Sequence, residues 1–287
     1  MNVAEIMEQR NAFSFEVFPP KTDVGMEKLC GEGGVLEKLY TLNPDYISCT
    51  YGAGGTNVGK NLEVLKKIKA DGKCTPVTHF TCVANTKEGI KDQLQTYLDN
   101  GIDHMLALRG DIPFGWTGTN GDLHYATELV KFVRKEFGDK FTIAVAGSPE
   151  GHIACEDLSL SVEYLKQKQD AGASFFVTQL FFDNECFYRF RELADKAGIT
   201  VPITAGIMPF MSKSQISRMV FMCGASLPSP VIKILAKYEN DPESLQAAGV
   251  DHATRQLCDL TEHGADGLHL YTMNRPAIAA TIMERLG

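Results

Sequence analysis

The sequence predicts a single (β/α)8 barrel, the TIM-barrel class of α/β fold, over residues 1–287. Eight short apolar runs with the character of strands alternate with longer amphipathic stretches of helical periodicity. Strict alternation of this kind implies a parallel sheet, and eight such units in a chain of this length favour a closed barrel. A doubly wound sheet is the competing architecture, but no GxGxxG motif follows the first strand.

The predicted strands are short and end in small or turn-forming residues. They are FSFEVF (13–18), YISCTYG (46–52), PVTHFTC (76–82), HMLALRG (104–110), FTIAVAG (141–147), FFVTQLFF (175–182), PITAGIMP (202–209) and GLHLYTM (267–273). Between them, stretches such as NLEVLKKIKA and KDQLQTYLDN place apolar residues at i, i+3, i+4 and i+7, which is typical of amphipathic helices.

The predicted helices end at glycines that stand just before strands: Gly101, Gly172, Gly198 and Gly264. Each is typical of a left-handed cap that closes a helix. Two segments fall outside the simple repeat. Residues 2–11 are predicted to form a helix before the first strand, and residues 224–263, which are too long for one crossover helix, are predicted to contain an extra helix around 228–238.

Charge and cysteine content exclude several classes of function. Lys plus Arg number 28 against 36 Asp plus Glu, so the chain is acidic, and no Lys/Arg run offers a site for nucleic acid or an anionic membrane. The eight cysteines form no CxxC, and no HxH or HExxH set is present, so no metal site is expected. Scattered thiols without an export signal or a long apolar run indicate a cytoplasmic protein.

The first predicted strand carries a carboxylate, Glu16, among aromatic residues. Alternation along the strand places Phe13, Phe15 and Val17 on one face and Ser14 and Glu16 on the other. If the apolar face packs under the helices, Glu16 points into the mouth of the barrel. Burying a carboxylate costs several kcal/mol unless it is paired or protonated, and a protonated carboxyl group is a proton donor. A structural glutamate, hydrogen-bonded inside the barrel, is the alternative interpretation.

Other polar residues also fall at the carboxyl ends of the strands, where the chemistry of such barrels takes place. Each has a structural interpretation as well: Asp111 could cap a helix, Arg109 could pair with Asp111, and His79 could be a satisfied core histidine. Their convergence at one end of the sheet favours a functional site. They are Thr50, Tyr51, His79, Thr81, Arg109, Asp111, Gln179, Asp183, Tyr271 and Arg275.

Read in order, the motifs FSFEVFPPKT, YISCTYGAGGT, THFTC, LALRGD, DAGASFFVTQLFFD, AGIMP and LYTMNR resemble the 5,10-methylenetetrahydrofolate reductase family of the bacterial type, from about residue 13 to the end. The resemblance implies a catalytic barrel that holds FAD and reduces 5,10-methylenetetrahydrofolate to 5-methyltetrahydrofolate, a step of one-carbon metabolism and methionine biosynthesis. It implies NADH or NADPH as electron donor and an oligomeric protein.

The resemblance also assigns roles to residues. It makes Glu16 the proton donor that helps to open the folate imidazolidine ring, and Asp111 a residue beside the flavin that also contacts the pterin. The positions at which the family contacts FAD are Thr50, Tyr51, Ala53, His79, Arg109, Gly110, Asp111, Ala126, His152 and Lys168. The positions for folate or nicotinamide are Asp111, Gln179, Tyr271 and Arg275, of which Arg275 suits the glutamate tail of folate.

The sequence departs from the family pattern at two places. After GIMP the family often carries an aromatic residue that packs on nicotinamide or folate, and the alignment places Lys213 there, with Phe210 nearby. Ser161 and Tyr164 stand where an Asp and an Asn often contact FAD. Lys213 favours an alternative in which the folate chemistry is the same but electrons arrive through a small metal-containing partner subunit. A flavin-free methyltransferase-type barrel and a metal-dependent lyase are the other classes considered.

Overall fold

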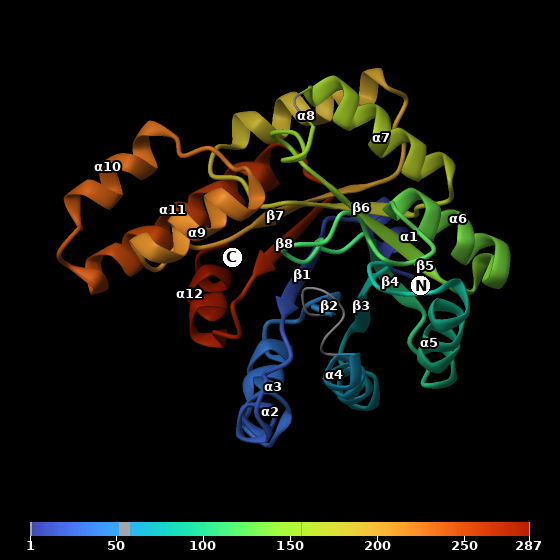
Figure 1. Cartoon of the computed structure of the whole chain (residues 1–287). Helices are drawn as coiled ribbons and strands as arrows, with labels where there is room; N and C mark the ends of the chain where they lie inside the picture. Colours follow the sequence, from blue (N-terminus) through green and yellow to red (C-terminus); the bar gives the residue numbers. More distant parts are fainter. Residues whose placement is uncertain (1, 52–57, 156, 287) are drawn as a thin grey trace.

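A computed structural model describes residues 2–51, 58–155 and 157–286, and it shows one closed barrel of parallel strands (Figure 1). Each strand pairs in parallel with the next one in the chain, and the last pairs with the first. The predicted fold class and the eight predicted strands are confirmed. The strands are β1 (Ala12–Val17), β2 (Tyr46–Cys49), β3 (Thr75–Thr81), β4 (His104–Leu108), β5 (Thr142–Gly147), β6 (Phe175–Thr178), β7 (Ile203–Ile207) and β8 (Gly267–Tyr271).

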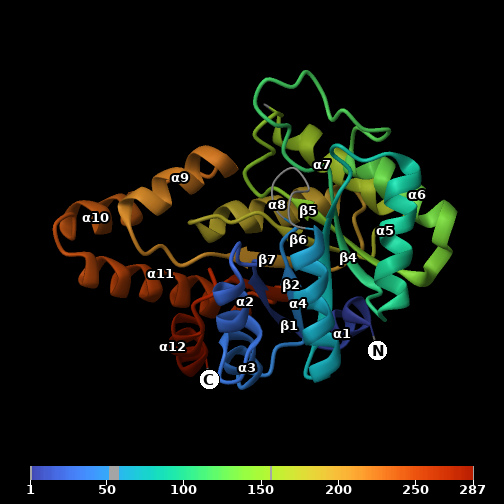
Figure 2. The ribbon, with the colours of Figure 1, turned by 60° about the horizontal axis from the view of Figure 1, so that its bottom comes forward.

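Helices cover the outside of the barrel. The predicted helix before the first strand is confirmed as α1, and the predicted extra helix as α10. The connection from β1 to β2 holds two short helices where the repeat predicts one, and α9 and α10 extend to one side of the barrel in both views (Figures 1 and 2). The helices are α1 (Val3–Gln9), α2 (Asp23–Cys30), α3 (Val35–Tyr40), α4 (Val58–Asp71), α5 (Lys87–Asp99), α6 (Ala126–Phe137), α7 (Leu158–Asp170), α8 (Asn184–Lys196), α9 (Lys213–Cys223), α10 (Ser229–Lys237), α11 (Pro242–Glu262) and α12 (Pro276–Leu286), with a 3-10 turn η2 (Gly138–Lys140).

The glycines predicted to end helices have the backbone geometry that this role requires. The φ angles of Gly101, Gly172, Gly198 and Gly264 are +71°, +112°, +74° and +69°. A residue with a Cβ atom adopts such angles at a steric cost, whereas glycine does not. These positions therefore turn the chain from each helix directly into the next strand.

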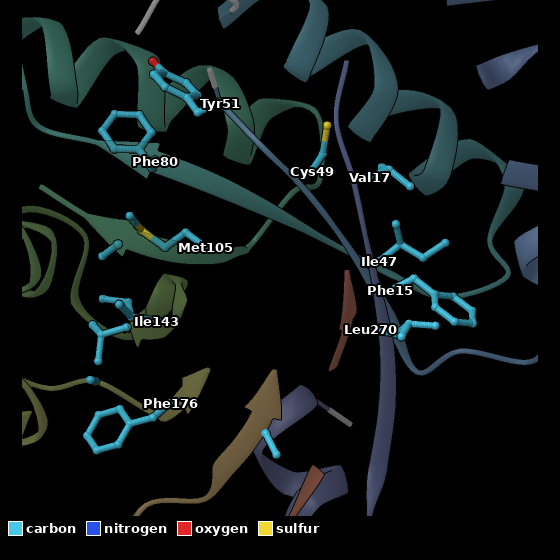
Figure 3. Packing of buried hydrophobic residues seen from close by; sticks show 14 of the residues in the cluster. Phe15, Val17, Ile47, Cys49, Tyr51, Phe80, Met105, Ile143, Phe176 and Leu270 are labelled. Atoms are coloured by element: carbon cyan, nitrogen blue, oxygen red, sulfur yellow. The ribbon is translucent and has the colours of Figure 1, made fainter. Parts of the chain in front are cut away.

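Each strand has one face that packs against the outer helices and one face that points into the barrel. Phe15, Val17 and Leu270 belong to the apolar layer between barrel and helices, as the alternation in β1 predicts (Figure 3). Inside the barrel, a second apolar cluster fills the floor, and Val3 and Met7 of α1 close it from below. Figure 2 shows α1 at the opposite end of the barrel from the long loop after β4. The floor is therefore sealed, and polar chemistry is confined to the upper end.

The helices α9 and α10 and the start of α11 extend from the barrel (Figures 1 and 2). Helix α11 packs on the barrel through a close backbone contact. A Cβ atom at Gly249 in α11 would overlap the main-chain oxygen of Phe210, a fully buried residue that follows β7. We predict that Gly249→Ala lowers the free energy of unfolding by about 1–3 kcal/mol, the usual cost of overpacking. Gly59→Ala in α4 is the matched control, because its Cβ would meet nothing within 4 Å and alanine favours the helix. Urea denaturation measures both, and equal stability of the two variants would contradict the contact.

Candidate active site at the mouth of the barrel

Glu16 lies near the carboxyl end of β1, on the face opposite to Phe15 and Val17. Its Oε2 atom is 3.4 Å from Nε2 of His79 on β3 and 3.7 Å from Nε2 of His269 on β8. The Glu16 side chain is 19% exposed, against 10% and 2% for the two histidines. The structure therefore holds a carboxyl group between two buried imidazoles and leaves it accessible from the mouth.

The main chain around Glu16 is held by β8 and the turn that follows it. Glu16 and Tyr271 are partners in the β1–β8 pair, and the hydroxyl of Thr272 donates to the carbonyl oxygen of Glu16 at 2.7 Å. The side chain of Asn274 accepts from the amide of Phe18 at 3.1 Å and donates to its carbonyl oxygen at 2.8 Å. The last strand thus fixes both Glu16 and the chain that leaves it.

The turn after β8 is conformationally strained. Met273 and Asn274 have φ angles of +52° and +55°, in the left-handed region that residues with a Cβ atom seldom adopt. Thr272 stabilises the turn, because its hydroxyl accepts from the Asn274 amide at 3.2 Å and its carbonyl accepts from the Arg275 amide at 2.9 Å. Strain of this kind concentrates at functional sites. The turn sets the direction in which the exposed residue Arg275 leaves the sheet.

His269 is fixed on three sides, and the sequence interpretation missed it. Its Nδ1 lies 2.7 Å from the hydroxyl oxygen of Ser14, its ring stacks on Tyr46 with centroids 5.8 Å apart, and its other side meets the edge of Tyr271 at 5.1 Å. A signal was present: His269 stands two residues before Tyr271, so strand alternation puts both on the inward face. Ser14, Thr272 and Asn274 act through local contacts that periodicity does not reveal.

Two of the predicted substrate residues, Tyr271 on β8 and Gln179 after β6, lie on either side of β7. The hydroxyl of Tyr271 donates to the carbonyl oxygen of Thr178 at 2.7 Å. Gly206 makes room for this contact, since a Cβ there would stand 2.8 Å from the tyrosine hydroxyl. Gln179 follows Thr178 directly, and its side-chain oxygen accepts from the amide of Leu180 at 2.9 Å. The hydrogen bond to β6 therefore fixes the position of the Tyr271 ring, and Gln179 directly follows the same strand.

Asp111 lies on the exposed loop after β4. Burial and, to a smaller extent, the negative charges of Asp111 and Glu16 raise the pKa of the Cys223 thiol, at the end of α9, to about 11. Both carboxylates therefore lie near enough to Cys223 for their charges to act on the thiol.

Three basic residues from different elements form a cluster beside the mouth: Arg109 after β4, His152 after β5, and Lys168 on α7. Burial lowers the pKa of His152, and the positive charges of Arg109 and Lys168 lower it further. Lys168 donates to the carbonyl oxygen of Ala146 at 2.9 Å, and burial lowers its pKa to about 8. Within the described part of the chain, no carboxylate forms an ion pair with Arg109 or Lys168. The cluster is therefore suited to a bound anion.

Two buried polar atoms near the mouth make no hydrogen bond to the described residues: Nε2 of His79, which lies 3.4 Å from the Glu16 carboxylate, and Oγ1 of Thr81. Gly110 has a φ angle of +87° and packs closely on Val83, since a Cβ there would come within 2.6 Å of the Val83 side chain. Buried polar groups normally have a partner, so these atoms fit a polar ligand bound at the mouth. Together with the basic cluster, they fit a dinucleotide that carries a pyrophosphate.

The remaining residues predicted to contact FAD differ in where they lie relative to the mouth. The main chain of Thr50 donates to the carbonyl oxygen of Val17 at 3.0 Å, next to Glu16. The side chain of Tyr51 packs in the outer apolar layer and donates to Gln93 at 2.5 Å, so it points away from the mouth. Ala126 is the first residue of α6. Ala53 lies outside the described residues.

The residues at which the sequence departs from the family pattern lie apart from one another. Lys213 begins α9 and pairs with Glu239 at 2.6 Å, with 60% of its side chain exposed. Phe210 is fully buried against Phe182, so it offers no free face. Ser161 accepts from the His152 amide at 3.3 Å, which keeps this position in contact with the basic cluster. Neither Lys213, paired at the surface, nor the buried ring of Phe210 offers a free aromatic face.

No group of three or more His, Cys, Asp or Glu side chains in the described ranges is placed to hold a metal ion. None of the helices in these ranges combines the length and the apolar character that crossing a membrane requires.

Comparison with solved structures agrees with the fold. An uncharacterised protein from Clostridium thermocellum, described as binding two copies of 5-methyl-5,6,7,8-tetrahydrofolic acid, matches with a TM-score of 0.70 over 98% of this chain and 96% of its own. The two sequences are 15% identical, so this likeness concerns the barrel alone.

Comparison with protein families and curated sequences goes further. The family model described as methylenetetrahydrofolate reductase matches residues 2–287. The 5,10-methylenetetrahydrofolate reductases of Pectobacterium carotovorum and Escherichia coli are 34% and 33% identical over 286 residues, covering 100% of this chain and 93% and 94% of their own. Methylenetetrahydrofolate reductase (NADH) 1 of Arabidopsis thaliana is 35% identical, and the chain spans about half, 50%, of its length. The chain therefore belongs to the methylenetetrahydrofolate reductase family.

Proposed function

We propose that this chain reduces 5,10-methylenetetrahydrofolate to 5-methyltetrahydrofolate with FAD as its cofactor and Glu16 as the proton donor. The observation that carries the proposal is the placement of Glu16: an accessible carboxyl group between two buried imidazoles, in a barrel of this family. Opening the imidazolidine ring of the folate requires a proton on the departing nitrogen. A general acid at the mouth supplies that proton and typically accelerates such a step by about 10²–10⁴-fold.

The residues present fit FAD as the resident cofactor. Arg109, His152 and Lys168 would hold its pyrophosphate, and the unpartnered polar atoms of His79 and Thr81 would meet the neighbouring polar groups. When bound, FAD supplies the hydride that converts the exocyclic iminium carbon into a methyl group. The task of the protein is to bind and orient both molecules, to keep water from the iminium, and to deliver one proton.

The roles proposed at the folate combine the family resemblance with the position of each residue at the mouth. Glu16 gives its proton to the nitrogen as the carbon–nitrogen bond breaks, which leaves a cationic iminium. Asp111, on the loop after β4, stabilises this positive charge. Gln179 and Tyr271 orient the pterin, and Arg275 pairs with the glutamate tail. The strained turn after β8 places Tyr271 and Arg275 in one fixed relation to Glu16.

NADH is the electron donor we favour over a metal-containing partner subunit. The plant relatives are named as NADH-dependent reductases. The sequence favours a partner subunit for two reasons: Lys213 offers no aromatic face, and its charge would repel a cationic nicotinamide. The pairing of Lys213 with Glu239 weakens the second reason. No other feature of the described residues favours the partner.

We predict that Glu16→Gln leaves FAD bound and reducible, because the acid acts on the folate alone. Reduction of methylenetetrahydrofolate should fall by about 10²-fold or more. Glu192→Gln, on the outer surface and paired with Lys196, is the control and should keep full activity. Steady-state turnover and anaerobic flavin bleaching separate the two halves of the reaction. Near-normal folate turnover by Glu16→Gln would refute the assigned role.

The basic cluster predicts that FAD affinity depends on pH. Burial lowers the pKa of Lys168 to about 8 in the protein without FAD. Below that pH the ammonium group is charged and attracts the pyrophosphate. Above pH 8 it loses its proton, and the affinity should fall. In Lys168→Met the affinity should be lower at pH 7 and change little between pH 7 and 9.5. Lys166→Met on the same helix, where Lys166 pairs with Asp170, is the matched control. Fluorescence titration of the apoprotein with FAD measures all three, and identical pH profiles would remove Lys168 from the site.

The position of Lys213 predicts how a substitution there affects flavin reduction by NADH. Since its ammonium group pairs with Glu239 at the surface, Lys213→Phe should leave the rate of flavin reduction by NADH unchanged within about twofold. Stopped-flow mixing with NADH under nitrogen measures this rate for both proteins. A large gain in the variant would restore the idea of a missing aromatic cover. Failure of both NADH and NADPH to bleach the flavin would favour delivery of electrons by a partner.

A further inference from the structure

Ser14, His269 and Glu16 form a line of polar contacts inside the barrel. The Ser14 hydroxyl oxygen is 2.7 Å from Nδ1 of His269 and 3.2 Å from the main-chain oxygen of Leu268. On the other side of the ring, Nε2 of His269 is 3.7 Å from Oε2 of Glu16. Ser14 and His269 are partners in the β1–β8 pair and are 0% and 1% exposed, so bulk water does not compete for the contact between these two side chains.

Counting hydrogens identifies the tautomer of His269. The Ser14 hydroxyl has one hydrogen, and a carbonyl oxygen can only accept. If Ser14 donates to Leu268, its oxygen is free to accept from an N–H at Nδ1 of His269, and both contacts become hydrogen bonds. If Ser14 instead donates to Nδ1, the contact with Leu268 is lost. The arrangement that satisfies both places the hydrogen on Nδ1 and leaves Nε2 bare.

A bare Nε2 has a definite effect on its neighbour. Its lone pair faces the Oε2 atom of Glu16 at 3.7 Å, beyond the distance of a direct hydrogen bond, and its partial negative charge there disfavours a carboxylate relative to a neutral carboxyl group. In a buried setting this difference is poorly screened. The opposite tautomer, with the hydrogen on Nε2, would place a positive partial charge towards Oε2 and stabilise the carboxylate. The tautomer of His269 therefore biases the state of Glu16, together with His79, whose Nε2 lies 3.4 Å from the same oxygen.

We propose that Ser14 fixes His269 in the Nδ1–H tautomer, and that the bare Nε2 keeps Glu16 protonated between turnovers. The catalytic consequence rests on the function proposed above, and the assignment of the tautomer does not. Glu16 gives its proton to the folate nitrogen as the carbon–nitrogen bond breaks, and a proton from solvent restores the acid. His269 neither gains nor loses a proton and does not touch the folate, so it is a positioning residue.

Other titratable groups face Glu16, and their charges are constant above pH 7. Burial lowers the pKa of His79 from 6.5, so it is neutral there. Burial raises the pKa of Cys223 to about 11, and the pKa values of the remaining groups also lie well above their ordinary values because of burial. These groups are Tyr46 and Cys49 from β2 and Tyr271 from β8. A change of rate between pH 7 and 9 that depends on Ser14 therefore reports Glu16 and His269.

Nitrogen NMR of the protein labelled with ¹⁵N-histidine tests the tautomer directly. The signals of His269 are those that disappear in His269→Gln. We expect the wild type to show a protonated Nδ1 and a bare Nε2, and Ser14→Ala to shift toward the opposite tautomer. Ser48→Ala is the matched control, because Ser48 is the partner of Glu16 on β2, is equally buried, and contacts no imidazole among the described residues. A wild-type spectrum with the hydrogen on Nε2 would overturn the proposal without the need for any variant.

The pH dependence of folate reduction tests the consequence. In Ser14→Ala, the decline of the rate with rising pH should begin about one pH unit lower than in the wild type, which is a ~10-fold loss at a given pH on the declining side that is recovered at lower pH. Ser48→Ala should follow the wild type. An equal loss at every pH would show a structural role for Ser14 and refute the link to Glu16. If the wild type reduces no folate at all, the proposed function fails, while the NMR result still decides the tautomer.

Discussion

The pairing of β1 with β8 is the contact on which the rest of the site depends. It closes the barrel, and its register places Ser14 beside His269 and Glu16 beside Tyr271. A shift by one residue would turn each of these side chains to the opposite face, because successive side chains of a strand alternate. Thr272 and Asn274 then hold the end of β1 from the same side. Closure of the sheet and assembly of the site are therefore a single event.

The division of the barrel into an apolar floor and a polar mouth follows from the same geometry. Below Glu16, the inward residues are mainly apolar, and α1 seals them with Val3 and Met7. Above it, unpartnered polar atoms, two carboxylates and a basic cluster surround the opening. A polar ligand thus has one place to bind. Water inside the floor would leave apolar side chains hydrated, so the seal also keeps the local dielectric low around Glu16 and His269.

The fold could be predicted from the sequence because its signals, strand alternation and helix-ending glycines, are local and recur in every βα unit. Alternation within β1 predicts that Glu16 points inward, and glycines such as Gly101 mark where helices end. The site was predicted in part. His269 was missed although the inward position of Tyr271 implies it. Tyr51 and Lys213 were placed by alignment, which assigns a residue to a position but does not say which way its side chain turns. The structure directs Tyr51 toward Gln93 and Lys213 toward Glu239.

We propose that this barrel passes a hydride from reduced FAD to a methylene folate that Glu16 protonates. A single turnover tests this proposal most directly. The wild-type flavoprotein is reduced photochemically without nicotinamide and mixed under nitrogen with one equivalent of 5,10-methylenetetrahydrofolate, while flavin absorbance and the folate products are followed. The account predicts full reoxidation of the flavin with one equivalent of 5-methyltetrahydrofolate formed. A flavin that stays reduced while folate is bound would contradict it.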